Sequence, residues 1–243
     1  MNKLYKKGEL SFALTWIVSY VVGTSATEEL SRIIGIEKIM TLPFLLILCA
    51  VALIWINNNG FFERFGLCQT YLRAKSFVYY IPLIVLASCN FWCGVKINGT
   101  WWEFLLYALS MLCVGFLEEL IFRGFLFCAM KKDGVKSAII VSSVTFGTGH
   151  IVNLFNGSGA TLVANLCQIL SAIGIGFLFV IIFYRGKTIM PCVFAHQFIN
   201  VSSFFANESA ITNEIRILQS LIICAIAIVY AAILFKTLPN EKE

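Results

Sequence analysis

The sequence predicts an all-α fold: a polytopic helical membrane protein with about eight transmembrane helices. Of its 243 residues, 59% are hydrophobic and only 13% are charged, and the mean hydropathy is +0.86. A soluble domain of this size has too little interior to hide so much apolar surface. The apolar residues are also grouped in stretches of the length, about 20 residues, that a helix needs to cross a hydrocarbon core of ~30 Å.

Eight apolar stretches are separated by short polar gaps, at residues 9–27, 39–57, 76–95, 101–130, 136–153, 160–184, 187–206 and 214–236. The first also resembles a signal peptide, but we interpret it as a span because its loss would leave no basic N-terminal anchor. Residues 57–60 and 156–159 are typical of turns. The fourth stretch is long and begins with Trp101 and Trp102, which suit a position at the membrane interface.

The distribution of Lys and Arg predicts the orientation. If the N-terminus lies inside, the inner side has 13 basic residues and the outer side has four, with Arg123 left inside a span. The four on the outer side are Arg32, Lys38, Lys96 and Arg216. Because basic residues are enriched in cytoplasmic loops, we expect both termini in the cytoplasm. The Asn-, Ile- and Lys-rich composition favours a bacterial cell membrane.

No linker, repeat or soluble domain interrupts this pattern, so we expect a single integral membrane domain over residues 1–243. A net charge of +5 does not indicate nucleic-acid binding, because the basic residues form no cluster with interleaved aromatic residues. The nine Cys residues lie mostly inside the apolar runs without the spacing of metal ligands, and we interpret them as packing residues.

The fourth stretch contains three ionisable residues, Glu118, Glu119 and Arg123. Such groups are costly in a membrane span and are a functional-site hypothesis by default. Glu119 and Arg123 are at i and i+4, so they share one helix face and are expected to form an ion pair. Glu118 points roughly 100° away and has no basic partner in its own helix. A general base is one interpretation of Glu118, and a structural ion pair with a spare Glu is the other.

The only two His residues lie in separate spans, each with a partner at i, i+4 spacing: Phe146 with His150, and His196 with Asn200. A single His in an apolar helix is more often a packing residue than a catalyst. Two His residues opposite an unpaired Glu favour a site. Glu118 and His150 also lie 13 and 14 residues from the nearest inner-side Lys, which puts them at a similar depth in the membrane.

In this order and on successive apolar segments, the three motifs resemble those of the CPBP family, which comprises intramembrane CAAX-type prenyl endopeptidases and Abi or bacteriocin-processing relatives. The motifs are Glu118-Glu119-x-x-x-Arg123, Phe146-x-x-x-His150 and His196-x-x-x-Asn200. The resemblance covers residues 101–206, which would form the catalytic core. It implies an intramembrane endopeptidase that acts on a membrane-associated or lipidated peptide or protein.

The resemblance also implies roles for the motif residues. Glu118 would activate a water held by His150, His196 and Asn200, and Glu119, Arg123 and Phe146 would support the site. A Glu with two His also resembles a zinc site. The two His residues are on different segments, however, the sequence has no HExxH, and Asn is a poor zinc ligand. We therefore expect no cofactor, with zinc as the less favoured alternative.

Two other functions are compatible with part of this pattern. A membrane binding or bacteriocin-immunity protein of the same fold would use the buried polar site without catalysis. A small transporter would usually show an internal repeat, and the sequence shows none. The partners we expect are a peptide or lipidated protein substrate and the lipid bilayer, but no nucleic acid.

Overall fold

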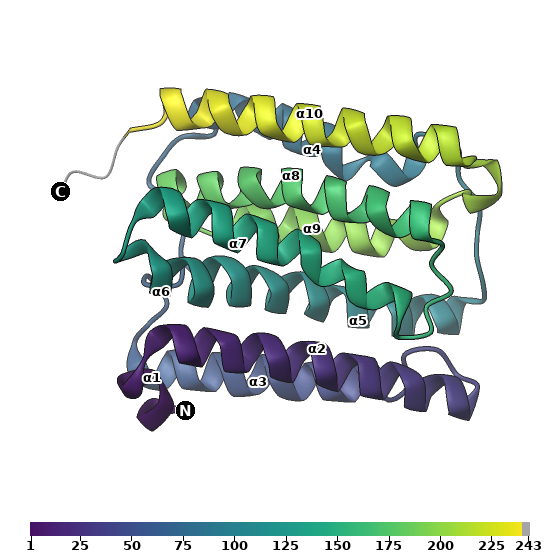
Figure 1. The fold of residues 1–243 in the computed structure, drawn as a ribbon, viewed down its shortest axis with the longest axis horizontal. Helices are drawn as coiled ribbons and strands as arrows, with labels where there is room; N and C mark the ends of the chain where they lie inside the picture. Colours follow the sequence, from purple (N-terminus) through teal and green to yellow (C-terminus); the bar gives the residue numbers. More distant parts are fainter. Residues whose placement is uncertain (240–243) are drawn as a thin grey trace.

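The computed structural model describes residues 1–239, which form a bundle of long helices running roughly parallel to one another (Figure 1). The α-helices are α1 (Asn2–Lys7), α2 (Glu9–Ile34), α3 (Thr41–Asn59), α4 (Ile81–Ala87), α5 (Trp101–Glu119), α6 (Cys128–Lys131), α7 (Val135–Gly149), α8 (Leu162–Gly186), α9 (Met190–Ser202) and α10 (Asn213–Thr237).

Within residues 1–239, seven helical segments are long and apolar enough to cross a membrane. Their outward surfaces are apolar: on α2, for example, Leu14, Val18 and Val22 are 48%, 60% and 61% exposed. Such a surface is stable in contact with lipid chains and unstable in water. The prediction of a polytopic helical membrane protein is confirmed.

Two of the eight predicted spans differ from regular crossing helices. Residues 187–206 contain α9, which has 13 residues and is therefore only about 20 Å long, followed by a short 3₁₀ turn, Ser203–Phe205. This stretch is not among the seven segments that meet the length criterion. In the stretch 76–95, positive φ angles at Val78, Tyr79 and Tyr80 interrupt the helix, so that α4 begins only at Ile81.

The long fourth stretch is one continuous helical segment of 31 residues, Trp101–Lys131. A capping box between Thr100 and Glu103 begins α5. After Glu119 the helix widens into a π-helical segment, Leu120–Phe127, before α6. Such π-helical turns are rare and are frequently found at functional sites.

Aromatic side chains join the two N-terminal spans to the rest of the bundle at one end. The ring of Phe125 in the π-helical segment lies 5.2 Å from Phe12 on α2 and 4.9 Å from Phe65 after α3. All three side chains are buried. Elsewhere the helices pack closely at small residues. A Cβ on Gly176 of α8 would lie 3.0 Å from the backbone oxygen of Ser143 on α7, so a glycine lets these two helices approach.

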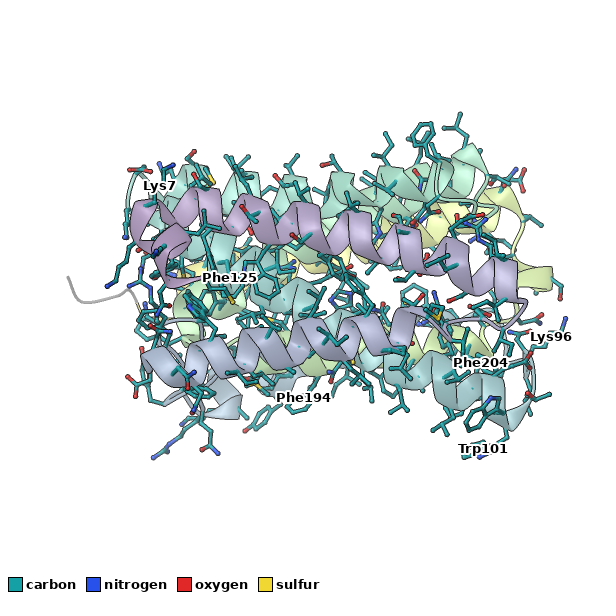
Figure 2. All side chains as sticks on the ribbon, turned by 90° about the horizontal axis from the view of Figure 1, so that it is seen from below. Lys7, Lys96, Trp101, Phe125, Phe194 and Phe204 are labelled. Atoms are coloured by element: carbon teal, nitrogen blue, oxygen red, sulfur yellow. The ribbon has the colours of Figure 1, made fainter. Side chains whose placement is uncertain are left out.

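Both ends of the described chain lie at the same end of the bundle, where α1 begins and α10 ends (Figure 1). Lys7 lies at this end, whereas Lys96 and Trp101 lie at the opposite end (Figure 2). We call these the terminal end and the far end of the bundle. That the terminal end faces the cytoplasm remains a prediction.

Candidate active site

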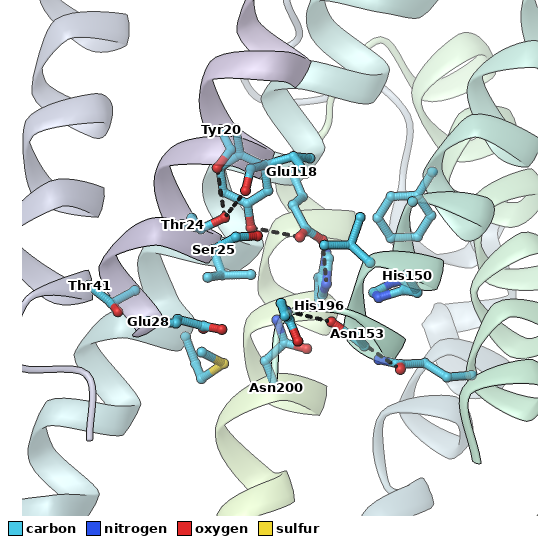
Figure 3. A pocket seen from close by; sticks show the side chains of 18 of the residues that line it. Tyr20, Thr24, Ser25, Glu28, Thr41, Glu118, His150, Asn153, His196 and Asn200 are labelled. Carbon is cyan, nitrogen blue, oxygen red and sulfur yellow. Dashed lines mark hydrogen bonds and ion pairs between the residues drawn. The ribbon is translucent and has the colours of Figure 1, made fainter. Parts of the chain in front are cut away.

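A polar cavity of about 460 Å³ lies inside the bundle between α2, α5, α7 and α9 (Figure 3). All four residues predicted to be catalytic line it: Glu118, His150, His196 and Asn200. They come from three segments that are separated in sequence, so the packing of the helices brings them together.

Glu118 is held from two sides. The Tyr20 hydroxyl on α2 donates a hydrogen bond of 2.7 Å to Glu118 Oε1, and Nε2 of His196 lies 3.5 Å from Glu118 Oε2. Oε2 has no hydrogen-bond partner within the described part of the chain. One carboxylate oxygen is thus fixed by Tyr20, while the other faces an imidazole and keeps its lone pairs available.

Glu119 is fully buried and connects two other site residues. Its Oε1 atom lies 3.0 Å from Nη1 of Arg123 and 2.8 Å from Nδ1 of His196. The predicted ion pair between Glu119 and Arg123 is confirmed. Because a carboxylate can only accept, its hydrogen bond with His196 assigns a proton to Nδ1 and directs Nε2 toward Glu118.

Phe146 lies between the guanidinium group of Arg123 and the imidazole rings of the two His residues. The guanidinium carbon of Arg123 lies 4.1 Å from the centre of the Phe146 ring, a cation–π contact that favours keeping this buried cation in place. The same ring lies 5.7 Å from the ring of His150 and 5.8 Å from that of His196. Phe146 therefore separates Arg123 from the cavity and packs against both His residues.

His150 and Asn200 lie on other walls of the cavity. His150 begins a 3₁₀ turn, His150–Leu154, directly after α7, and its backbone oxygen accepts a hydrogen bond of 2.7 Å from Asn165 on α8. Asn200 follows His196 by one turn of α9, and its backbone oxygen accepts a hydrogen bond from Ser203. Both side chains are partly exposed, so they are accessible from the cavity.

Sequence reasoning missed Tyr20, which makes the shortest contact with Glu118 from 98 residues away. A signal was present at the end of the first predicted span and directly after it, where Tyr20, Thr24 and Glu28 repeat at intervals of four residues. That spacing places polar groups on one helix face. In the structure all three line the cavity, as Figure 3 shows.

Imidazole and carboxylate groups, which this site contains, are common protein ligands of a metal ion. Across residues 1–239, no group of three or more His, Cys, Asp and Glu side chains is arranged to hold one. In His196, Nδ1 is engaged by Glu119, so only Nε2 remains for another partner.

Comparison with known proteins identifies one family. The family described as type II CAAX prenyl endopeptidase Rce1-like matches residues 100–202, a segment that contains all seven site residues predicted from the motifs. No curated protein and no solved structure matches the chain. The family match confirms the resemblance carried by the motifs: residues 100–202 of this membrane protein are similar to the Rce1-like type II CAAX prenyl endopeptidases.

Proposed function

We propose that the protein is an intramembrane endopeptidase that hydrolyses a peptide bond of a membrane-associated or lipidated peptide or protein, with Glu118 as the general base. The observation that supports this most directly is the arrangement of Glu118 between Tyr20 and His196 in a polar cavity within an apolar bundle. A carboxylate with one oxygen fixed and one available is suited to accept a proton from water.

In the proposed reaction, Glu118 accepts a proton from a water molecule as the water oxygen attacks the scissile carbonyl carbon. The carbonyl oxygen becomes an oxyanion, to which His150 and Asn200 would donate hydrogen bonds. Donors of this kind are each worth several kcal/mol in other enzymes. Glu118 then returns the proton to the leaving amine as the C–N bond breaks, so the carboxylate is regenerated.

The remaining residues hold the reacting side chains in place. Glu119 holds the ring of His196 through Nδ1, and Arg123 compensates the charge of Glu119 in a buried site. Tyr20 holds the carboxylate of Glu118 in one rotamer. We propose that no metal ion takes part, because Glu118 can itself perform the proton transfers.

The test is Glu118→Gln, which keeps the size of the side chain but removes its ability to accept a proton. Turnover of a prenylated CAAX peptide, or of an unprenylated peptide set, should fall by about 10²–10⁴-fold in detergent, and the yield of folded protein should be unchanged. Glu63→Gln, at an exposed turn position outside the cavity, is the matched control and should behave as the parent. The parent should keep its turnover after treatment with a chelator.

Parent-like turnover by folded Glu118→Gln protein would contradict the assigned base. Loss of turnover on chelation, restored by stoichiometric zinc, would contradict the metal-free mechanism. Tight binding of a peptide without turnover would support the non-catalytic binding or immunity function instead.

A further inference from the structure

From Phe122, one turn beyond Glu118, the cavity extends along the bundle toward one end. On α2 its lining runs from Tyr20 to Glu28, toward the C-terminal end of that helix. On α5 it runs from Glu118 back to Tyr107, toward the N-terminal end. Since α2 and α5 are antiparallel, both directions lead to the far end of the bundle, opposite the two termini (Figure 1).

The terminal side of Glu118 is closed by packed side chains. Arg123 and Leu120 are completely buried in the next turns of the same helical segment, and Phe125 is 3% exposed. On α2 the turn before Tyr20 contains Trp16, which is 7% exposed and packs against Phe125. Within residues 1–239, these packed side chains close the terminal side of Glu118 to a peptide.

At the far end the cavity adjoins a second one. The two share Glu28 and Asn156, and the second is lined further by exposed loop residues such as Gly35 and Ser158. The Arg32 guanidinium at the end of α2 donates to the backbone oxygen of Asn156 across this opening. The polar route from Glu118 thus reaches the surface between the end of α2 and the loop that precedes α8.

The walls of this route are suited to an extended peptide. Five amide side chains line it: Asn90, Asn153, Asn156, Gln168 and Asn200. An amide group both donates and accepts hydrogen bonds, as each peptide unit of a substrate backbone does. Among the described residues, the lining of the inner cavity contains no Lys or Arg, whereas Arg32 and Lys38 line the opening. The inner part of the route therefore has no counter-charge for a phosphate or a cluster of carboxylates.

We propose that the substrate is an extended peptide segment that enters the site from the far end of the bundle, between α2 and the loop at residues 155–161. This inference rests on the proposed protease function and adds the side from which the substrate comes. If the termini lie in the cytoplasm, as the Lys and Arg distribution predicts, the peptide is presented at the opposite, extracytoplasmic face of the membrane. The substrate is then an exported peptide or the outer portion of a membrane protein.

The experiment uses the full chain in sealed vesicles, with a C-terminal tag that an external protease removes only when the termini face outward. A charged, membrane-impermeant peptide that is cleaved in detergent is added outside. We expect cleavage before detergent addition to be proportional to the fraction of protein whose tag is protected. Cleavage proportional to the fraction with an accessible tag would overturn the inference. Absence of cleavage even in detergent would contradict the proposed protease function instead.

A second measurement compares two Trp substitutions on α2. Ser25 lines the route, so Ser25→Trp should obstruct it and lower peptide cleavage at least tenfold. Val22 is 61% exposed on the outer surface of the same helix, and Val22→Trp should leave cleavage within about twofold of the parent. Equal cleavage by two equally folded variants would show that the peptide does not pass along this wall.

Discussion

Glu118 and Glu119 are neighbours in sequence, but their surroundings give them different tasks. Glu119 is completely buried and compensated by Arg123. Glu118 lines the cavity and is bonded to a neutral hydroxyl. Glu119 Oε1 is engaged by both Arg123 and His196, whereas Glu118 Oε2 has no hydrogen-bond partner within the described residues and belongs to a side chain that lines the cavity. This difference is the physical reason for assigning the base to Glu118.

Tyr20→Phe tests whether Tyr20 positions the carboxylate of Glu118. A hydrogen bond to a charged group is worth about 1.5–3 kcal/mol, so we expect kcat to fall by about tenfold or more while KM stays near the parent value. Tyr107→Phe is a matched control, since Tyr107 lines the same cavity but its hydroxyl is bonded to Ser203 at 2.6 Å. Kinetic assays of both variants check this. An equal effect of the two substitutions would mean that loss of a hydroxyl in the cavity, not the contact with Glu118, is responsible.

Arg123→Ala should lower stability, because it leaves Glu119 charged and buried without its partner, a change worth roughly 3–5 kcal/mol. Thermal unfolding in detergent measures this. The double substitution Arg123→Met with Glu119→Gln removes both charges and should regain part of the lost stability. If Arg123→Ala unfolded at the same temperature as the parent, the ion pair would have no role in folding.

At the scale of the helices, the site depends on how closely α7 and α8 approach, because α7 carries Phe146 and leads directly into the turn that begins with His150. Gly147 faces α8: a Cβ there would lie 2.7 Å from the backbone nitrogen of Ile173. A Cβ at Gly149, two residues later, would meet nothing within 4 Å. The close approach of α8 therefore requires a glycine at residue 147, whereas packing does not require one at residue 149 of the same helix.

Gly147→Ala should destabilise the protein and Gly149→Ala should not. Alanine gains up to about 1 kcal/mol over glycine from helix propensity, which is the expected result at residue 149. At residue 147 the methyl group meets backbone atoms that cannot rotate away, and overpacking of this kind costs about 1–3 kcal/mol. Thermal unfolding of the two variants in detergent distinguishes them, and a higher unfolding temperature for Gly147→Ala would show that α7 and α8 can separate freely.

For the whole molecule, the position of both termini at one end of the bundle predicts an even number of passages through the membrane. The short helix α9 must then be counted as one of them, even though its 13 residues are fewer than the roughly 20 needed by a lipid-exposed span. Its buried residues, such as Cys192 and Val193, pack against other helices inside the bundle. A helix packed in this way does not need to match the thickness of the hydrocarbon core.

Reporter fusions at the two termini test this arrangement. We expect both reporters to be active in the cytoplasm and a reporter inserted in the loop after α2 to be active outside. This follows from the 13 basic residues on the inner side and the four on the outer side. Reporters active on opposite sides of the membrane would mean that α9, or the irregular segment before α4, does not cross.

The sequence by itself determined what depends on local spacing. Runs of apolar residues determined the membrane fold, and the i, i+4 spacing of Glu119 and Arg123 determined their ion pair, because helix geometry alone brings such residues together. The three motifs likewise indicated the family that residues 100–202 resemble. None of these inferences required knowledge of how the helices pack.

Only the tertiary structure decided which groups meet across helices. Glu118 contacts Tyr20 98 residues away, and Glu119 contacts His196 77 residues away. In a membrane, lipid-facing and buried helix surfaces are both apolar, so hydropathy does not show which face of a span meets which neighbour. Close approach at small residues such as Gly147 and the shape of the side chains set that packing. The partner of Glu118 and the direction in which its cavity opens therefore follow from the packed helices.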